Sequence, residues 1–369
     1  MQLVSVGAQD IHLTGNPQIT FFKIVYRRHT NFSIECIEQM LTGTVTQNSD
    51  KLISKISRDG DLIGRMHLDL KLPDNNGGDS NRHWINNTGH AYLKNISIHI
   101  GGQLIDTHYG HWLDIWNELT DFDNNEKSLI NKHESKFDYY NNISNDLSPL
   151  QLYIPLKFWF NRNIGQALPL IALQYHEVVI KLETRSLLTL VNSKPNDDAE
   201  TETLDTLTGV PSLKLFADYI YLDTEERRRF AQVSHEYLIE QLQYSTETAT
   251  NNTELNLNHP VKEIIWTIQN TNVIAEKITE VNNNASENNQ NSLNNGNDYF
   301  CYESLNTPAD SDMVEYINYQ PSYEPFDKCN IRLNGHDRFS KQKASYFRLV
   351  QPLQCGHKVP SKHIYLYNE

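Results

Sequence analysis

The chain has 369 residues and a formal net charge of −14 at pH 7. This length predicts two domains. The acidic balance argues against a coat for nucleic acid, which needs clustered Lys and Arg to neutralise phosphates. The basic run at residues 227–229 follows Glu225 and Glu226, so we expect it to be solvated or internally paired. No apolar run reaches the roughly 20 residues of a membrane-spanning helix, so we expect a soluble chain that is not inserted in a membrane.

The opening of the chain carries a long and distinctive segment. Residues 7–35 read GAQDIHLTGNPQITFFKIVYRRHTNFSIE. The segment is not a secretory signal peptide, because no apolar run follows a basic start. It is not an enzyme motif either, because it pairs no nucleophile with a base.

Alternating apolar and polar residues predict strands along most of the chain. In residues 66–72 every second residue is apolar, as in a strand with one face in solvent. Apolar residues also alternate over 96–100, and Gly101 and Gly102 separate them from residues 103–105. This pattern predicts a tight hairpin, because glycine adopts the positive φ angles of hairpin turns. Further strands are predicted at residues 178–183, 213–222, 237–243, 264–269 and 364–367.

Helices are predicted only in connections, at residues 111–120 and 126–137. Two segments predict loops: residues 192–209 are acidic and rich in turn formers, and residues 282–297 are almost entirely Asn, Ser and Gln. The second has nothing to bury, so its ordering entropy is not offset. We expect the inter-domain junction between them, at residues 223–236. Many short strands and few helices predict an all-β chain of the jelly-roll kind.

The sequence motifs do not support a catalytic function. Three His-Glu pairs occur, but none has the second His four residues further on that a HExxH zinc protease requires. These pairs begin at His133, His176 and His235. No dinucleotide-binding, P-loop or nucleophile-elbow motif occurs. We therefore predict no catalytic, cofactor-binding or metal-binding residues and no cofactor.

Metal and disulfide sites are equally unsupported. His108 and His111 form a two-ligand pair if both lie on a helix, but no third ligand is near, and a structural role is favoured. Asp121, Asp123 and Glu126 lack the spacing of a calcium-binding EF-hand. The four scattered cysteines form no CxxC pair, which argues against a redox or zinc motif and favours a reducing compartment. They are Cys36, Cys301, Cys329 and Cys355.

Four segments resemble the major capsid proteins of large nucleocytoplasmic icosahedral DNA viruses, of the iridovirus, phycodnavirus and mimivirus kind. Residues 7–35 resemble the amino-terminal signature of that family. Residues 153–183 resemble the late strands of its first jelly roll, and the resemblance places the aromatic residues 158–160 in the core. Residues 218–241 resemble the passage between the rolls, and residues 332–367 resemble part of the second roll.

The resemblance implies an all-β fold of two tandem eight-stranded jelly rolls. It places an amino-terminal arm at residues 1–25, the first roll at 26–223 and the second roll at 224–369. Family members continue beyond the strand that corresponds to residues 364–367, so we expect the second roll to be incomplete and to lack its last strands. No internal repetition is visible between the halves.

The function implied by the resemblance is that of a structural subunit of an icosahedral viral capsid, not an enzyme. Three copies would form a homotrimer, a capsomer of pseudo-hexagonal outline. Its partners would be neighbouring capsomers, minor capsid proteins and an internal viral membrane beneath the shell, with no direct contact to nucleic acid. Assembly into the virion is expected in the host cytoplasm.

Two other functions remain open. One is a jelly-roll binding protein or minor capsid protein of the same virion that recognises carbohydrate or a receptor; exposed aromatic residues in the loops would favour it, but the loops are mainly Asn, Asp, Ser and Thr. The other is an enzyme on a cupin-like barrel, which needs about three metal ligands converging from two strands.

Overall fold

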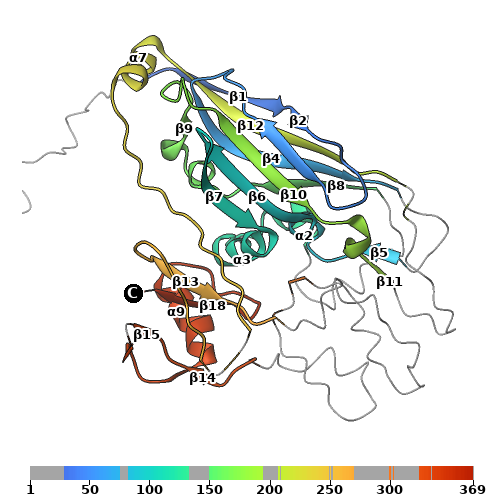
Figure 1. Cartoon of the computed structure of the whole chain (residues 1–369), viewed down its shortest axis with the longest axis vertical. Helices are drawn as coiled ribbons and strands as arrows, with labels where there is room; N and C mark the ends of the chain where they lie inside the picture. Colours follow the sequence, from blue (N-terminus) through green and yellow to red (C-terminus); the bar gives the residue numbers. More distant parts are fainter. Residues whose placement is uncertain are drawn as a thin grey trace, which may run out of the picture.

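The computed structural model describes residues 29–74, 82–132, 149–193, 207, 209–248, 250, 252–269, 299–300, 302, 324–333 and 335–368. The described part of the first half is a sandwich of two antiparallel sheets (Figure 1). No helix among the described residues is long and apolar enough to cross a membrane.

Each sheet of the sandwich has five strands. One contains, in order, β1 (Phe32–Gln39), β12 (Ser212–Leu222), β4 (Leu62–Leu72) and β8 (Leu150–Pro155), with β9 (Leu168–Pro169) also paired to β4. The other contains β2 (Leu41–Thr42), β3 (Lys51–Lys55), β10 (Val178–Thr184), β6 (Leu93–Ile100) and β7 (Gln103–Tyr109). A separate pair joins β5 (Arg82–Trp84) to β11 (Val191–Ser193).

The strand order identifies the sandwich as a jelly roll. When β2, β5, β9 and β11, which have two or three residues each, are set aside, eight longer strands remain. Numbered along the chain, they lie in the order 1-8-3-6 in one sheet and 2-7-4-5 in the other. First and last strands are therefore neighbours, as the Greek-key connections of a jelly roll require. β1 and β12 pair over the full length of β1, from Phe32 opposite Leu222 to Gln39 opposite Leu215.

Most of the predicted strands are confirmed. Residues 66–72 belong to β4, 178–183 to β10 and 213–222 to β12. The predicted hairpin is the turn between β6 and β7, where Gly101 has φ +59° and Gly102 has φ +84°. Both glycines thus take the left-handed conformation that a two-residue hairpin turn demands.

The strand predicted at residues 237–243 is wrong. This segment runs along the edge of β7 without forming a ladder. Instead, the Gln241 side chain donates a hydrogen bond to the Ile105 carbonyl oxygen (2.6 Å), and the Leu242 amide donates to a carboxylate oxygen of Asp106 (3.0 Å). Side-chain groups thus satisfy edge positions that a strand would have paired through its backbone.

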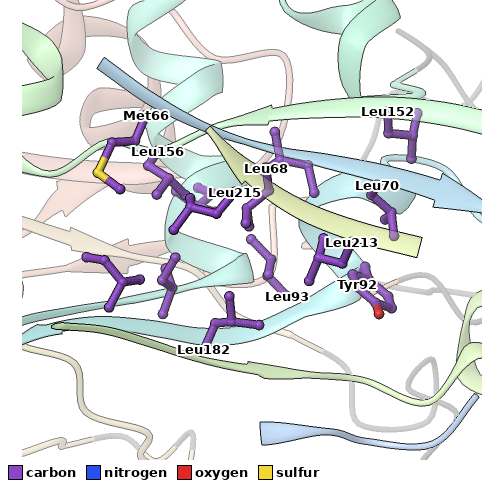
Figure 2. Packing of buried hydrophobic residues seen from close by; sticks show 14 of the residues in the cluster. Met66, Leu68, Leu70, Tyr92, Leu93, Leu152, Leu156, Leu182, Leu213 and Leu215 are labelled. Atoms are coloured by element: carbon purple, nitrogen blue, oxygen red, sulfur yellow. The ribbon is translucent and has the colours of Figure 1, made fainter. Parts of the chain in front are cut away.

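The core lies between the two sheets. Figure 2 shows Leu68 and Leu70 of β4 and Leu215 of β12 facing Leu93 of β6 and Leu182 of β10. All five side chains are buried. The outward-facing residues of β4 are polar, so the alternation in the sequence sorts the two faces of the strand.

The aromatic residues 158–160 close one side of this core, as the resemblance implies. Phe158, Trp159 and Phe160 are at most 5% exposed and lie at the start of the short helix α6 (Trp159–Arg162). Asn161 holds this helix against β4, because its side-chain amide donates to the Gly64 carbonyl oxygen at 2.7 Å.

Helix α3 (Gly110–Thr120) confirms the prediction at 111–120 and lies at the end of the roll that faces the second half (Figure 1). Helix α2 (Thr88–Tyr92) is next to it. The helix predicted at residues 126–137 is much shorter than expected, because α4 (Lys127–Ile130) ends at Asn131 in the left-handed conformation. Residues 133–137 lie outside the described part.

Gly110 allows α3 to begin directly against α2. A Cβ atom at this position would overlap the carbonyl oxygens of His90 and Leu93, which are backbone atoms and cannot turn aside. We expect Gly110→Ala to lower the free energy of unfolding by about 3 kcal/mol, measured by urea denaturation. Gly165→Ala is the control, because its Cβ meets no atom closer than 3.4 Å; equal stability of the two variants would contradict the prediction.

The second half contains short elements. Its described strands pair as β13 (Glu263–Trp266) with β18 (Tyr365–Asn368), β14 (Lys328–Cys329) with β17 (Gln342–Lys343), and β15 (Arg332–Leu333) with β16 (His336–Asp337). β13 is shorter than the predicted 264–269, and β18 confirms the strand predicted near 364–367. A π-helix (Tyr346–Val350) continues into α9 (Gln351–Gln354). Phe347 and Tyr365 form the small core of this region.

Helix α7 (Thr224–Gln232) follows β12 and is capped by the Asp223 side chain. Its basic run is partly paired internally: the Arg227 guanidinium lies 2.9 Å from the carboxylate of Asp61, a residue that is only 4% exposed. From α7 the chain runs down beside the roll to the second half (Figure 1).

Candidate functional site

The two halves meet on helix α3 through buried charges. Asp114 and Glu118 are one helical turn apart, so they share a face, and they are 0% and 6% exposed. From the second half, the Lys362 ammonium lies 2.9 Å from both carboxylate oxygens of Asp114. The Ser361 hydroxyl donates to a carboxylate oxygen of Glu118 at 3.0 Å. We call Asp114, Glu118, Lys132 and Lys362 the junction cluster.

Lys132 supplies the second cation of the junction cluster. Its ammonium lies 2.7 Å from a Glu118 oxygen and 2.7 Å from the Asn117 side-chain oxygen. Two cations thus face two carboxylates, and the cluster is neutral overall. Burial by itself raises the pKa of Asp114, but Lys362 and Lys132 together hold that pKa below its usual value. Burial likewise raises the pKa of Glu118, and Lys132 and Lys362 lower it below its usual value. Both carboxylates therefore stay charged.

Aromatic rings cover the cations at this junction. The Lys362 ammonium lies 5.3 Å from the centre of the Phe300 ring and 5.7 Å from that of Tyr302. The Arg185 guanidinium lies 4.6 Å from the centre of the Tyr299 ring. Such contacts are stronger where water is excluded. The Arg185–Tyr299 contact joins the two halves, whereas the contacts of Lys362 with Phe300 and Tyr302 lie within the second half.

Histidines line the junction in their neutral form. His90 of α2 is completely buried, and burial, followed by Lys132, lowers its pKa well below the usual value. His111, in the first turn of α3, stands edge-on to the Phe300 ring at 5.5 Å. Burial and, secondarily, Arg185 lower the pKa of His111 to about 4.

We expect acid to destabilise this junction. An unfolded histidine titrates near pH 6.5 and the folded His111 near 4, so the unfolded chain binds more protons between these values and stability falls as the pH falls. The loss from His111 reaches about 3 kcal/mol at pH 4 and is absent above about pH 7. Thermal unfolding across this range measures it. His111→Gln should flatten the pH dependence; an unchanged slope would contradict the assignment.

His108 and His111 do not form a ligand pair. His108 lies on β7, where its ring nitrogen is 2.9 Å from an Asp106 oxygen and its ring stacks on Phe158 at 4.5 Å. His111 lies on α3. Among the described residues, no group of three or more His, Cys, Asp or Glu side chains is placed to hold a metal ion. The described cysteines Cys36, Cys329 and Cys355 are free thiols.

The remaining sequence candidates have structural contacts. Glu177, next to His176, pairs with Lys55. His235 stacks on Phe230 at 5.0 Å and hydrogen-bonds its carbonyl oxygen. Asp121 accepts hydrogen bonds from backbone amides of the loop that follows α3, including that of Glu126 at 3.0 Å. His133 lies outside the described part.

Sequence reasoning missed the junction cluster. Lys362 is 248 residues from Asp114 in the chain, and no spacing links them. One signal was available: Asp114 and Glu118 are four residues apart in the helix predicted at 111–120, so they share one face of it. Two carboxylates on a buried face require cationic partners.

Comparison with known proteins covers both halves. Two family models match: "Major capsid protein N-terminus" at residues 20–223 and "Large eukaryotic DNA virus major capsid protein" at residues 226–368. The major capsid protein of Pyramimonas orientalis virus is 42% identical over 98% of this chain and 76% of its own length. That of Paramecium bursaria Chlorella virus 1 is 36% identical over 100% of this chain and 80% of its own length.

Solved structures agree with these relatives. The quasi-atomic model of the PBCV-1 virus capsid is 32% identical, with a TM-score of 0.66 over 95% of this chain and 80% of that one. The Faustovirus major capsid protein has a TM-score of 0.67 over 99% of this chain and 86% of that one. At 12% identity the second likeness bears on the fold alone.

Proposed function

Because the chain belongs to the major capsid proteins of large eukaryotic DNA viruses, we propose that three copies of it assemble into a capsomer of pseudo-hexagonal outline. The chain is a structural protein of the viral capsid and a component of the virion, not an enzyme. Its fold is the all-β double jelly roll of these proteins. The relatives are named major capsid proteins, which favours this function over a carbohydrate-binding or receptor-binding one.

The junction cluster is the observation that supports a trimer of pseudo-hexagonal outline. A pseudo-hexagonal capsomer needs two rolls held at one angle in every copy, because three copies then present six similar units around a closed axis. A buried contact of paired charges holds such an angle better than an apolar one, since sliding would leave a charge unpaired. Asp114 with Lys362, and Glu118 with Ser361, supply this constraint.

The division of the chain is part of the proposal. We place the arm at residues 1–25, the first roll at 26–223 and the second from 224 to 369. Two observations support the boundary: the family models meet between residues 223 and 226, and α7 begins at Thr224 directly after β12. The proposal includes no catalytic, cofactor-binding or metal-binding residues.

The proposed partners of the capsomer are neighbouring capsomers, minor capsid proteins and a viral membrane beneath the shell, with assembly in the host cytoplasm. The net charge of −14 supports a shell that does not contact the genome, because direct phosphate contacts need a basic surface.

Light scattering on size-exclusion peaks of the purified chain, with negative-stain images of the same fractions, tests the trimer. We expect a particle of three times 42.7 kDa with a hexagonal outline. A monomer that stays monomeric at high concentration would overturn the proposal.

A further inference from the structure

A groove on the second half has an apolar floor and a basic rim. It has a volume of about 470 Å³, within the range of ligand-binding pockets, and it lies between the β14–β17 pair and the π-helix. Leu349 and Val350 contribute to the floor and are 39% and 40% exposed. The lysines of the lining, which we call the rim lysines, are Lys328, Lys341 and Lys343.

The rim lysines lie close to one another, so their positive charges repel. Lys328 of β14 and Lys343 of β17 are direct cross-strand partners, and like charges in that position destabilise a strand pair. Lys341 directly precedes β17 (Gln342–Lys343) and lines the same groove. Such a cluster is unfavourable unless an anion lies between the side chains.

The rim lysines form no ion pair with the described part of the chain. Among the ion pairs of the described residues, none includes a rim lysine. Neighbouring cations of the second half do have carboxylate partners: Arg332 pairs with Asp337 at 2.7 Å and Arg348 with Glu324 at 2.8 Å. Residues 324–350 carry 6 Lys and Arg against 3 Asp and Glu, in a chain whose net charge is −14.

This contrast indicates what the groove binds. Copies of a chain with so much negative charge repel one another in a shell, and a basic groove is where an acidic part of a neighbour can approach. The densest acidic stretch of the sequence is residues 197–205, DDAETETLD, with five carboxylates in nine residues and no Lys or Arg. It also contains Leu204, an apolar side chain suited to the floor of the groove.

We infer that the groove receives the acidic segment 197–205 of a second copy of this chain, with its carboxylates on the rim lysines and Leu204 on Leu349 and Val350. The inference rests on the proposed function, because it specifies how neighbouring capsid subunits contact one another. It adds a surface, an occupant and a charge pattern to that function.

Binding of a fluorescent peptide with the sequence of residues 195–207 tests the contact directly. Anisotropy is measured with the wild-type chain and with Lys328→Glu/Lys341→Glu/Lys343→Glu. The matched control, Lys51→Glu/Lys71→Glu/Lys181→Glu, makes the same charge change at exposed lysines of the first roll. All substituted lysines are exposed, and circular dichroism verifies that both variants fold.

We expect the rim variant to bind the peptide at least tenfold more weakly, the control variant to bind within about twofold of wild type, and added salt to weaken wild-type binding. A peptide with Asn and Gln in place of the five acids should not bind. Equal binding by the rim variant, or no binding by the wild type, would overturn the inference. So would binding of phosphatidylserine vesicles that depends on the rim lysines while the acidic peptide does not compete.

Light scattering of the same samples separates the two proposals. If the wild-type chain forms trimers that do not bind the peptide, the groove contact is contradicted and the proposed capsomer is not. A monomeric wild-type chain that binds the peptide through the rim lysines would support the groove contact and reject the trimer.

Discussion

Replacing Asp114 by Asn is expected to lower the free energy of unfolding by about 3–5 kcal/mol, because it removes a buried charge that both Lys132 and Lys362 face. The Asp114 carboxylate lies 2.9 Å from Lys362 and 3.8 Å from Lys132, and it accepts a hydrogen bond from the Asn87 amide at 2.7 Å. With Asn in its place, Lys362 loses both of its contacts with the Asp114 carboxylate oxygens. Urea denaturation followed by tryptophan fluorescence measures the loss.

A double-mutant cycle separates the ion pair from other effects. Asp114→Asn/Lys362→Met should lose less than the sum of the single variants, because the remaining groups are then both neutral. The control is Lys214→Met, which breaks the exposed pair with Glu38, where both side chains are about half exposed; its effect should stay below about 1 kcal/mol. If Asp114→Asn matched this control, the junction cluster would not hold the halves together.

Replacing Phe158 by Ala is expected to cost about 3–5 kcal/mol, since the buried ring leaves a cavity that the strands around it cannot close. Phe158 is 0% exposed. Its ring stacks on His108 at 4.5 Å and lies 6.0 Å from the Phe160 ring. The side chain therefore joins β7 to the start of α6.

Differential scanning calorimetry checks this effect, and the temperature of unfolding should fall by roughly 10 °C. The unfolding temperature of Phe158→Leu should lie between those of Phe158→Ala and the wild type, because leucine restores part of the lost side-chain volume. Tyr175→Ala is the control, since Tyr175 is 92% exposed and its loss should change stability by less than about 0.5 kcal/mol. If the unfolding temperature of Phe158→Ala equals that of this control, the ring is not part of the core.

The strands of the first roll could be predicted because their signal is local. Residues 66–72 and 96–100 alternate between apolar and polar side chains, and β4 and β6 contain them. The Gly101-Gly102 turn is equally local, because the φ angles that it needs favour one residue type. The segment 237–243 has similar composition but lies beside β7 without a ladder. Its local pattern could not reveal that side chains would take the edge hydrogen bonds.

The sequence by itself determined most strands of the first roll, the all-β class and the family, because alternation and turn chemistry act within a few residues and the capsid-like segments are contiguous. The tertiary structure alone decided the junction cluster and the rim lysines. Lys362 meets Asp114 across 248 residues, and Lys328 meets Lys343 only through strand pairing. A charge becomes costly or useful only when folding places it in a buried site or beside a like charge. Such surroundings are set by long-range packing and leave no periodic trace in the chain.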